Sequence, residues 1–306
     1  MKKDFLSIKD LKRREILDLI DRGLEIKRAG RSVSRSLTGY TIGLIFDKAS
    51  TRTRVSFEVA MFRLGGQTIF LNRAETQMSR DESEQDTARV LSRYLDGLII
   101  RTFSQEEIEE MARWAGIPVI NALTDLYHPC QVLSDLLTVK ENKNDLENLK
   151  VAWVGDGNNV AHSWINAASI LGFELYLACP KGYAPQKDIL SEAGSNVRVL
   201  DDPREAVADA DIINTDVWAS MGQEDEREKR LRDFKGFQLN QSLAQLAKPD
   251  VLVMHCLPAH RDEEITSEVM DGPNSIVLDQ AENKLYLHQA LLEKLLLNNK
   301  EYLNNE

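Results

Sequence analysis

The residues with the clearest capacity for chemistry are Ser50-Thr51-Arg52-Thr53-Arg54, which follow an apolar run at residues 41–46 and open a helix-patterned stretch at residues 55–64. A helix start offers unpaired backbone N–H groups and the positive end of the helix dipole. Hydroxyl and guanidinium groups, which bind phosphate oxygens well, stand at the same place. The segment therefore predicts a phosphate-binding cradle. The alternative is a Ser-capped helix with exposed arginines.

Further polar residues stand where expected strands and loops end. Arg101 ends an apolar run at residues 97–100, and His128-Pro129-Cys130-Gln131 leads from a loop into a helical pattern. Open parallel sheets bind ligands at the carboxyl ends of their strands, so we expect these groups on the edge that carries the cradle. The alternative for His128 is a structural histidine beside a proline-started helix.

A thiol stands beside an imidazole in His255-Cys256-Leu257-Pro258-Ala259-His260-Arg261, directly after the apolar run at residues 251–254. This pairing suggests an activated cysteine. His255, Cys256 and His260 could also be zinc ligands, but the sequence has no second ligand pair at the spacing of a structural zinc site. The pattern therefore favours a substrate site over a metal site.

A glycine-rich turn, Gly155-Asp156-Gly157-Asn158-Asn159, follows an expected strand at residues 151–154 and looks like a dinucleotide-binding turn. The third glycine of that motif is replaced by Val160. A nicotinamide-dependent dehydrogenase is therefore disfavoured.

The elements that must position these residues alternate in type, as is typical of βαβ units. We expect strands at residues 68–71, 97–102, 117–122, 151–154, 174–178, 197–200, 211–214, 251–255 and 275–278. We expect helices at residues 8–28, 86–94, 104–116, 130–143 and 283–297. The pattern predicts an α/β fold of two domains, each a mainly parallel sheet flanked by helices. The charged run at residues 223–232 is expected to be a solvated loop or helix face, or a mobile lid.

A polar break at residues 141–148 marks the expected domain boundary. We predict a first domain at residues 1–143 and a second at residues 149–282, with a helix at about 283–306 packing back onto the first. A chain of 306 residues is long enough for two ordinary domains, each with its own core.

Composition excludes several classes of partner. The chain has 49 acidic and 38 basic residues and a net charge of −11, which argues against nucleic acid and anionic membranes as partners. Its first residues lack a hydrophobic signal core, and no apolar run has membrane-spanning length. The three cysteines, Cys130, Cys179 and Cys256, have no paired spacing, which favours thiols in a reducing, cytoplasmic compartment.

Four segments, taken together and in this order, resemble the ornithine carbamoyltransferases of the aspartate/ornithine carbamoyltransferase family: Ser50-Thr51-Arg52-Thr53-Arg54, His128-Pro129-Cys130-Gln131, Asp216-Val217-Trp218-Ala219-Ser220-Met221-Gly222 and His255-Cys256-Leu257-Pro258. The resemblance covers essentially the whole chain. It implies transfer of the carbamoyl group of carbamoyl phosphate to the side-chain amine of L-ornithine, giving L-citrulline and phosphate in arginine metabolism. It also implies a cytoplasmic homotrimer with sites shared between subunits, and no metal or organic cofactor.

The resemblance assigns carbamoyl phosphate to the first domain and implies a role for each matching residue. The contacts it implies are Ser50, Thr51, Arg52 and Thr53 for the phosphate, with Arg101 adding charge, and His128, Pro129, Cys130 and Gln131 for the carbamoyl end. Cys256, the Leu257 backbone and Lys284 are further implied contacts. Gln77 matches a loop residue that reaches the site of a neighbouring subunit. Cys256, His128, Arg101 and Asp216 are the implied catalytic residues.

The resemblance assigns ornithine to the second domain, with Asn159, Asp216, Ser220 and Met221 contacting its α-amino and α-carboxylate groups. The side-chain amine must lose its proton before it attacks, because an ammonium group has no lone pair. Cys256 is implied to accept that proton or to orient the charge. A covalent, nucleophilic role for the thiol is the rival, which direct attack by the amine makes unnecessary.

One position departs from the family pattern, since Ala281-Glu282-Asn283-Lys284 stands where Ala-Glu-Asn-Arg is usual. A lysine keeps the charge but loses the planar fork of a guanidinium group. Two other functions remain as alternatives: a carbamoyltransferase for another amine, such as putrescine or an N-acylated ornithine, and a non-catalytic sensor of carbamoyl phosphate or an amino acid. The sequence does not indicate whether citrulline is made or consumed.

Overall fold

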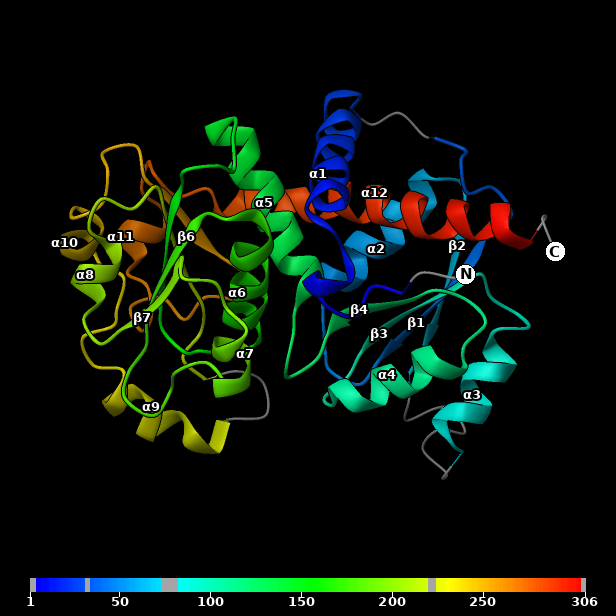
Figure 1. Cartoon of the computed structure of the whole chain (residues 1–306), viewed down its shortest axis with the longest axis horizontal. Helices are drawn as coiled ribbons and strands as arrows, with labels where there is room; N and C mark the ends of the chain where they lie inside the picture. Colours follow the sequence, from blue (N-terminus) through cyan, green and yellow to red (C-terminus); the bar gives the residue numbers. More distant parts are fainter. Residues whose placement is uncertain (1–3, 31–33, 73–81, 220–223, 304–306) are drawn as a thin grey trace. The chain divides into compact units, whose positions relative to one another are not determined.

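The computed structural model describes residues 4–30, 34–72, 82–219 and 224–303 of the chain (Figure 1). The chain divides into two compact units. The first unit comprises Met1–Leu137 and Glu282–Glu306, and the second comprises Thr138–Ala281. Each unit contains one parallel sheet flanked by helices, so the predicted fold class is confirmed.

The first unit is built on a four-stranded parallel sheet with the order β2-β1-β3-β4. Its strands are β1 (Thr41–Phe46), β2 (Gln67–Leu71), β3 (Gly97–Arg101) and β4 (Val119–Leu123). Every residue of β3 is buried, as expected for a parallel strand covered on both faces. The chain leaves β1 toward one edge for β2 and then returns to its other side for β3, so the point between β1 and β3 is where such a sheet binds ligands.

Helices cover both faces of this sheet. They are η1 (Ile8–Asp10), α1 (Arg13–Arg28), α2 (Arg52–Arg63), α3 (Glu84–Leu91), α4 (Gln105–Trp114), α5 (Pro129–Lys143) and α12 (Val277–Leu303), the last two extending into the second unit. In Figure 1, α3 and α4 lie on one face of the sheet and α2 and α12 on the other. Ser83 and Ser104 cap α3 and α4 by accepting backbone N–H bonds from Asp86 and Glu107.

The second unit is built on a five-stranded parallel sheet with the order β7-β6-β5-β8-β9. Its strands are β5 (Lys150–Val154), β6 (Glu174–Ala178), β7 (Val197–Leu200), β8 (Ile212–Thr215) and β9 (Leu252–His255). Its helices are α6 (Asn159–Leu171), α7 (Lys187–Ser191), α8 (Pro203–Val207), η4 (Glu224–Glu226), α9 (Arg227–Asp233), α10 (Gln241–Ala244) and α11 (Ser267–Met270). The chain order reverses between β5 and β8, which places the expected ligand edge beside these strands.

Two expected elements differ from the structure. The predicted strand at residues 275–278 is wrong, because Ser275 makes only an isolated bridge to Val253 and α12 already begins at Val277. An apolar run of this length fits a helix start as well as a strand, and Asp279 in the first turn suits the positive helix end. The predicted helix at residues 8–28 is divided into η1 and α1.

The charged run at residues 223–232 is helical in its described part, forming η4 and most of α9. Arg230 is buried there, while its neighbours Arg227 to Lys229 are exposed. The expectation of a solvated face is therefore wrong at Arg230. Within the described part of the chain, no helix combines the length and the apolar character that a bilayer crossing requires.

Candidate active site

The cradle segment lies where β1 ends and α2 begins, in the first unit. Ser50 and Arg52 are half-buried, and Thr53 is buried. Thr51, at the N-cap of α2, makes no side-chain cap hydrogen bond. The N–H groups of the first helical turn are therefore not satisfied by a cap, and with the helix dipole they favour an anion at this position.

Arg54 does not take part in the cradle. Its Nε atom donates to Glu58 Oε1 at 2.9 Å, and its guanidinium group stacks over the ring of Phe70 at 3.5 Å from the ring centre. Arg54 follows the buried residue Thr53 on α2, so its side chain points away from the buried side of the helix. Its contact with Phe70 places it against the edge strand β2. Arg52 remains the predicted cradle guanidinium group of this segment, and Arg54 is engaged elsewhere.

Arg101 and His128 lie at the carboxyl ends of neighbouring strands. Arg101 is the last residue of β3 and is 8% exposed, while buried His128 precedes α5, whose first residue is Pro129. Burial lowers the pKa of His128 well below its ordinary value, and the charges of Lys284, Arg101 and His288 lower it further. The imidazole is therefore neutral at neutral pH and can donate a hydrogen bond to an oxygen without carrying charge itself.

Lys284 joins this group from α12. It is buried, and its Nζ atom donates to Gln131 Oε1 at 2.8 Å and to Thr53 Oγ1 at 3.2 Å. Gln131 also donates from Nε2 to Asp135 Oδ1 at 2.8 Å. The first turns of α2 and α5 are thereby linked through one ammonium group, whose charge acts on His128 together with that of Arg101.

The Cys130 side chain is directed into the sheet. Its thiol donates to the Asn121 backbone carbonyl at 3.3 Å, and burial raises the pKa of Cys130 to about 12. The thiol is thus a protonated packing group against β4. The backbone of Cys130, and not its thiol, is therefore the part that can bind a substrate.

Two further residues near the cradle were not predicted from the sequence. Buried Lys48, between β1 and α2, forms an ion pair with Asp125 and lies over the ring of Phe103, and so ties the β1 loop to the loop that carries His128. His288 on α12 stacks on Phe57 with ring centres 3.6 Å apart. Neither contact has a local sequence signal, because each joins residues distant in the chain.

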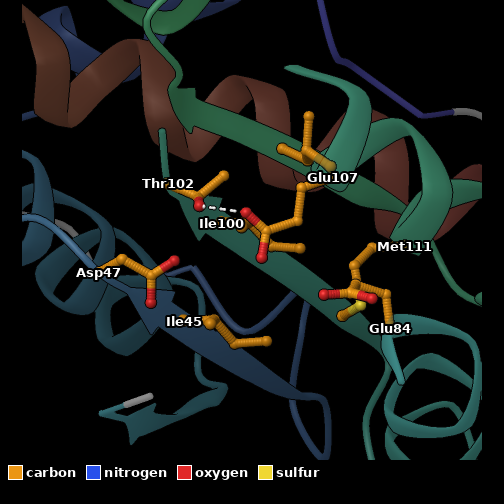
Figure 2. A pocket seen from close by; sticks show the side chains of 8 residues that line it. Ile45, Asp47, Glu84, Ile100, Thr102, Glu107 and Met111 are labelled. Atoms are coloured by element: carbon orange, nitrogen blue, oxygen red, sulfur yellow. Dashed lines mark hydrogen bonds between the residues drawn. The ribbon is translucent and has the colours of Figure 1, made fainter. Parts of the chain in front are cut away.

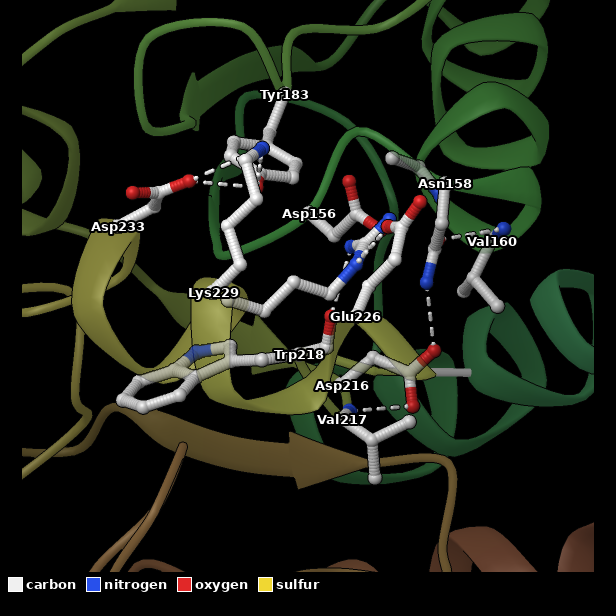
Figure 3. Close-up of polar contacts among 12 residues, drawn as sticks. Asp156, Asn158, Val160, Tyr183, Asp216, Val217, Trp218, Glu226, Lys229 and Asp233 are labelled. Carbon is white, nitrogen blue, oxygen red and sulfur yellow. Dashed lines mark hydrogen bonds and ion pairs between the residues drawn. The ribbon is translucent and has the colours of Figure 1, made fainter. Parts of the chain in front are cut away.

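The second unit holds its own group of polar residues at the ends of β5, β8 and β9. Figure 3 shows those that follow β5 and β8, among them Asn158 and Asp216. Asp216 directly follows β8 and is 7% exposed. Its Oδ1 atom accepts from the Val217 backbone N–H and from the Cys256 thiol, each at 2.8 Å. Asp216 and Cys256, which were predicted as site residues separately, are therefore in direct contact.

The turn after β5 supplies two asparagines. Asn159 is the first residue of α6, and Asn158 caps that helix. The Asn158 Nδ2 atom donates to Asp216 Oδ2 at 2.8 Å. Asn158 was not predicted as a site residue, although its place as an N-cap in a strand-to-helix turn is a signal that the sequence offers.

The geometry of His255 bears on the metal alternative. Among the described residues, ligand atoms of Asp216, His255 and Cys256 lie within 4.8 Å of one another. His255 Nδ1 accepts from the Leu257 N–H at 2.9 Å, so Nε2 carries the proton and faces Glu264 Oε1 at 3.1 Å. Since both ring nitrogens are engaged and the thiol is bound to a carboxylate, this donor set does not fit a metal ion.

Of the remaining predicted residues, Leu257 is described by the structure and three others are not. Leu257 has a positive φ of 56°, with its N–H directed to His255. Gln77, Ser220 and Met221 lie outside the described residues.

A small hollow lies near the cradle in the first unit but does not fit a substrate. Figure 2 shows its lining by Asp47, Thr102 and Glu107, with Thr102 donating to Glu107 at 2.8 Å. Its cavity volume is about 10 Å³, which is room for about one water molecule.

Comparison with known families identifies both units. Residues 3–141 match the carbamoyl-P binding domain of aspartate/ornithine carbamoyltransferase, and residues 147–295 match its Asp/Orn binding domain.

Individual relatives match nearly the full chain. An ornithine carbamoyltransferase from Syntrophus aciditrophicus is 53% identical over 302 residues, covering 97% of this chain and 100% of its own. One from Desulfotalea psychrophila is 52% identical over 296 residues, covering 95% and 98%. The solved structure of ornithine carbamoyltransferase from Pyrococcus furiosus superimposes with a TM-score of 0.91 at 47% identity, covering 95% and 96% of the two chains.

Proposed function

This chain belongs to the aspartate/ornithine carbamoyltransferase family, and we propose that it transfers the carbamoyl group of carbamoyl phosphate to the side-chain amine of L-ornithine, giving L-citrulline and phosphate. The proposal rests on the presence, in one chain, of a group of residues that suits an anion and a group that suits an amine. The first unit gathers cations and an uncapped helix start, which suit a phosphoryl anion. The second unit presents a carboxylate and a thiol in contact, which suit an amine.

In the first unit, the phosphate is proposed to lie on Ser50, Thr51, Arg52 and Thr53, with Arg101 and Lys284 neutralising its charge. Gln131, Pro129 and the Cys130 backbone are proposed to hold the carbamoyl end. Neutral His128 donates a hydrogen bond to the carbonyl oxygen, as Arg101 also does. These donors are aimed where negative charge develops, which is the arrangement that lowers the barrier most.

In the second unit, Asp216 and Asn159 are proposed to bind the α-amino and α-carboxylate groups of ornithine, together with Ser220 and Met221. Cys256 faces the side-chain amine, and the Leu257 backbone contacts the carbamoyl group. The thiol is already hydrogen-bonded to Asp216, so Asp216 orients the thiol as well as binding the substrate. The proposed catalytic residues are thus Cys256, His128, Arg101 and Asp216.

The reaction balances without a covalent enzyme intermediate. The neutral amine attacks the carbonyl carbon, forming the C–N bond and a tetrahedral oxyanion. Collapse of this species breaks the C–O bond to phosphate, which leaves with the bonding electron pair. The amine nitrogen loses one proton before attack and one after it, and phosphate and solvent take these protons up.

Free ornithine is the acceptor that the relatives support. The named relatives are ornithine carbamoyltransferases, and none of those given above is named for putrescine, an acylated ornithine or a sensor function. Asp216 further favours an acceptor with an α-ammonium group, which putrescine lacks.

Homotrimer assembly is proposed, with Gln77 of one subunit reaching the carbamoyl phosphate of the next. Exposed apolar side chains on α2 and on the edge strand β2 support it: Phe62 is 70%, Val55 50%, Ile69 46% and Phe70 36% exposed. Exposed apolar edge strands are sites of association. We also propose a cytoplasmic location and a place in arginine metabolism.

A competition assay tests the proposed acceptor. The purified chain is given carbamoyl phosphate and an equimolar mixture of ornithine, putrescine, N-acetylornithine and aspartate, and carbamoylated products are identified by mass. We expect citrulline alone. Carbamoylputrescine or an acylated citrulline would overturn the assignment of Asp216 while keeping the phosphate site, and no carbamoylated product would favour the sensor alternative.

A further inference from the structure

Asn158 uses both ends of its amide group. Its Oδ1 atom accepts from the backbone N–H groups of Val160 and Ala161 at 2.9 and 3.2 Å, which caps α6. Its Nδ2 atom donates to Asp216 Oδ2 at 2.8 Å (Figure 3). The two ends thus serve different partners, one local and one 58 residues away in the sequence.

The turn that carries Asn158 is fixed by its backbone. Gly155 N–H donates to the Ala178 carbonyl at 3.0 Å, and Gly157 N–H donates to the Tyr183 carbonyl at 2.8 Å. A side chain at Gly157 would place its Cβ 2.3 Å from the backbone nitrogen of Pro185. The turn therefore packs against the segment after β6 too closely to shift toward it.

A buried ion pair fixes the same turn from the side of α9. Arg230 Nη1 donates to Asp156 Oδ2 and to the Trp218 carbonyl, each at 2.8 Å. Asp156 belongs to the turn, and Trp218 stands two residues after Asp216. One guanidinium group thus ties the turn to the segment that contains Asp216.

The Asp216 carboxylate is oriented through both of its oxygens. Val217 N–H and the Cys256 thiol donate to Oδ1, and Asn158 donates to Oδ2. The Val217 N–H and the Cys256 thiol both bind Oδ1, so they leave the carboxylate free to rotate about that oxygen. The bond from Asn158 removes that freedom, because it anchors the second oxygen to a rigid turn.

We propose that Asn158 is a positioning residue for the amino-acid substrate: its amide sets the direction in which Asp216 meets the α-ammonium group. The inference rests on the proposed function and deepens it, since Asn158 acts through Asp216. Capping alone does not require asparagine, because aspartate and serine cap helices about as well. Asparagine supplies a capping oxygen and a donor for a carboxylate in one side chain.

Kinetics of Asn158→Asp separate the two roles. Aspartate keeps the capping oxygen, but it replaces the N–H donor by a second carboxylate beside Asp216. We expect KM for ornithine at saturating carbamoyl phosphate to rise by about tenfold or more, as for loss of a hydrogen bond to a charged group. The dissociation constant of carbamoyl phosphate should stay at the wild-type value, whereas the two facing carboxylates should lower the thermal midpoint.

Two further variants make the test specific. Asn240→Asp is the matched control, because Asn240 caps α10 by accepting from the Leu243 N–H and has no contact with Asp216 among the described hydrogen bonds. Its ornithine KM should equal that of the wild type. Asn158→Ser keeps a cap without adding charge but is too short to reach Asp216, so its ornithine KM should rise less than that of Asn158→Asp.

Three results would overturn the inference. The first is a wild-type ornithine KM for Asn158→Asp. The second is an equal weakening of ornithine binding and carbamoyl-phosphate binding together with a lowered thermal midpoint, which would mean that Asn158 has a structural role. The third is that the wild-type chain makes no citrulline, in which case the proposed function fails together with the inference. In the first two cases the wild type still forms citrulline, so the proposed function stands.

Discussion

The Nζ atom of Lys284 lies 2.8 Å from Oε1 of Gln131, so that a residue of the last helix, α12, contacts the first turn of α5. The same ammonium group donates to Thr53 at the start of α2. Three elements distant in the sequence are thus joined at the cradle. Since Lys284 is buried, its charge is little screened by solvent and acts strongly on an anion bound there.

Replacing Lys284 by arginine should tighten carbamoyl-phosphate binding. A guanidinium fork can donate two parallel hydrogen bonds where the ammonium group acts as a point charge. We expect the dissociation constant to fall by roughly threefold to tenfold in calorimetry, about 1 kcal/mol. Lys284→Met is the control that removes the charge and should weaken binding. A Lys284→Arg chain that folds normally but binds no tighter would show that the fork is not what this site lacks.

The two arginines of the cradle segment should behave differently. Arg52→Gln removes a cation from the start of α2 and should weaken carbamoyl-phosphate binding by roughly tenfold or more. Arg54→Gln should have a much smaller effect, because Arg54 is engaged with Glu58 and Phe70. Calorimetric titration of both variants with carbamoyl phosphate checks this. Equal losses would place Arg54 back in the cradle.

Replacing Cys256 should affect turnover more than carbamoyl-phosphate affinity. The thiol contacts Asp216 in the second unit, where the amine is proposed to bind. We expect Cys256→Ala to lower kcat by about 100-fold, as for misplacement of a reacting group, while the dissociation constant of carbamoyl phosphate stays within about twofold. Cys256→Ser, which keeps a donor for Asp216, should retain more activity. An equal fall in turnover and carbamoyl-phosphate affinity would contradict this role.

Acid should destabilise the chain through its buried histidines. Burial lowers the pKa of His288 well below its ordinary value of 6.5, with the Lys284 charge lowering it further, so the unfolded chain binds a proton that the folded chain does not. Stability is therefore full above pH 6.5 and falls as the pH drops below it, by about 1.4 kcal/mol per pH unit for this histidine.

The His288→Asn variant isolates this contribution. Between pH 7.5 and 5.5, urea unfolding of the wild type should lose more free energy than that of the variant, and the difference belongs to His288. Curves with the same pH dependence would mean that the folded chain protonates His288 as readily as the unfolded one.

Much of the fold was predictable because parallel strands buried on both faces read as short apolar runs, as β3 and β5 do. The run at residues 275–278 misled for the same reason, since periodicity does not separate a short strand from the start of a buried helix. In α2, motif composition placed Arg54 in the cradle, whereas helix geometry turns it toward β2.

The function also followed from the sequence, and the relatives confirm ornithine carbamoyltransferase as the main reading. The roles of individual site residues remain predictions. The contacts of Lys48, Asn158 and His288 could not be predicted, because each depends on a partner brought close only by the folded chain. Local patterns indicate which residues can do chemistry, and tertiary packing decides what orients them.

Carbamoyl transfer to ornithine is tested most directly by following the carbamoyl carbon itself. The purified chain is incubated with ¹³C-labelled carbamoyl phosphate and L-ornithine, and the carbon is observed by NMR while released phosphate is measured. We expect the label to appear in the ureido carbon of citrulline, with one phosphate released for each citrulline formed. Phosphate release that leaves the label in carbamate or bicarbonate, with ornithine unchanged, would contradict it.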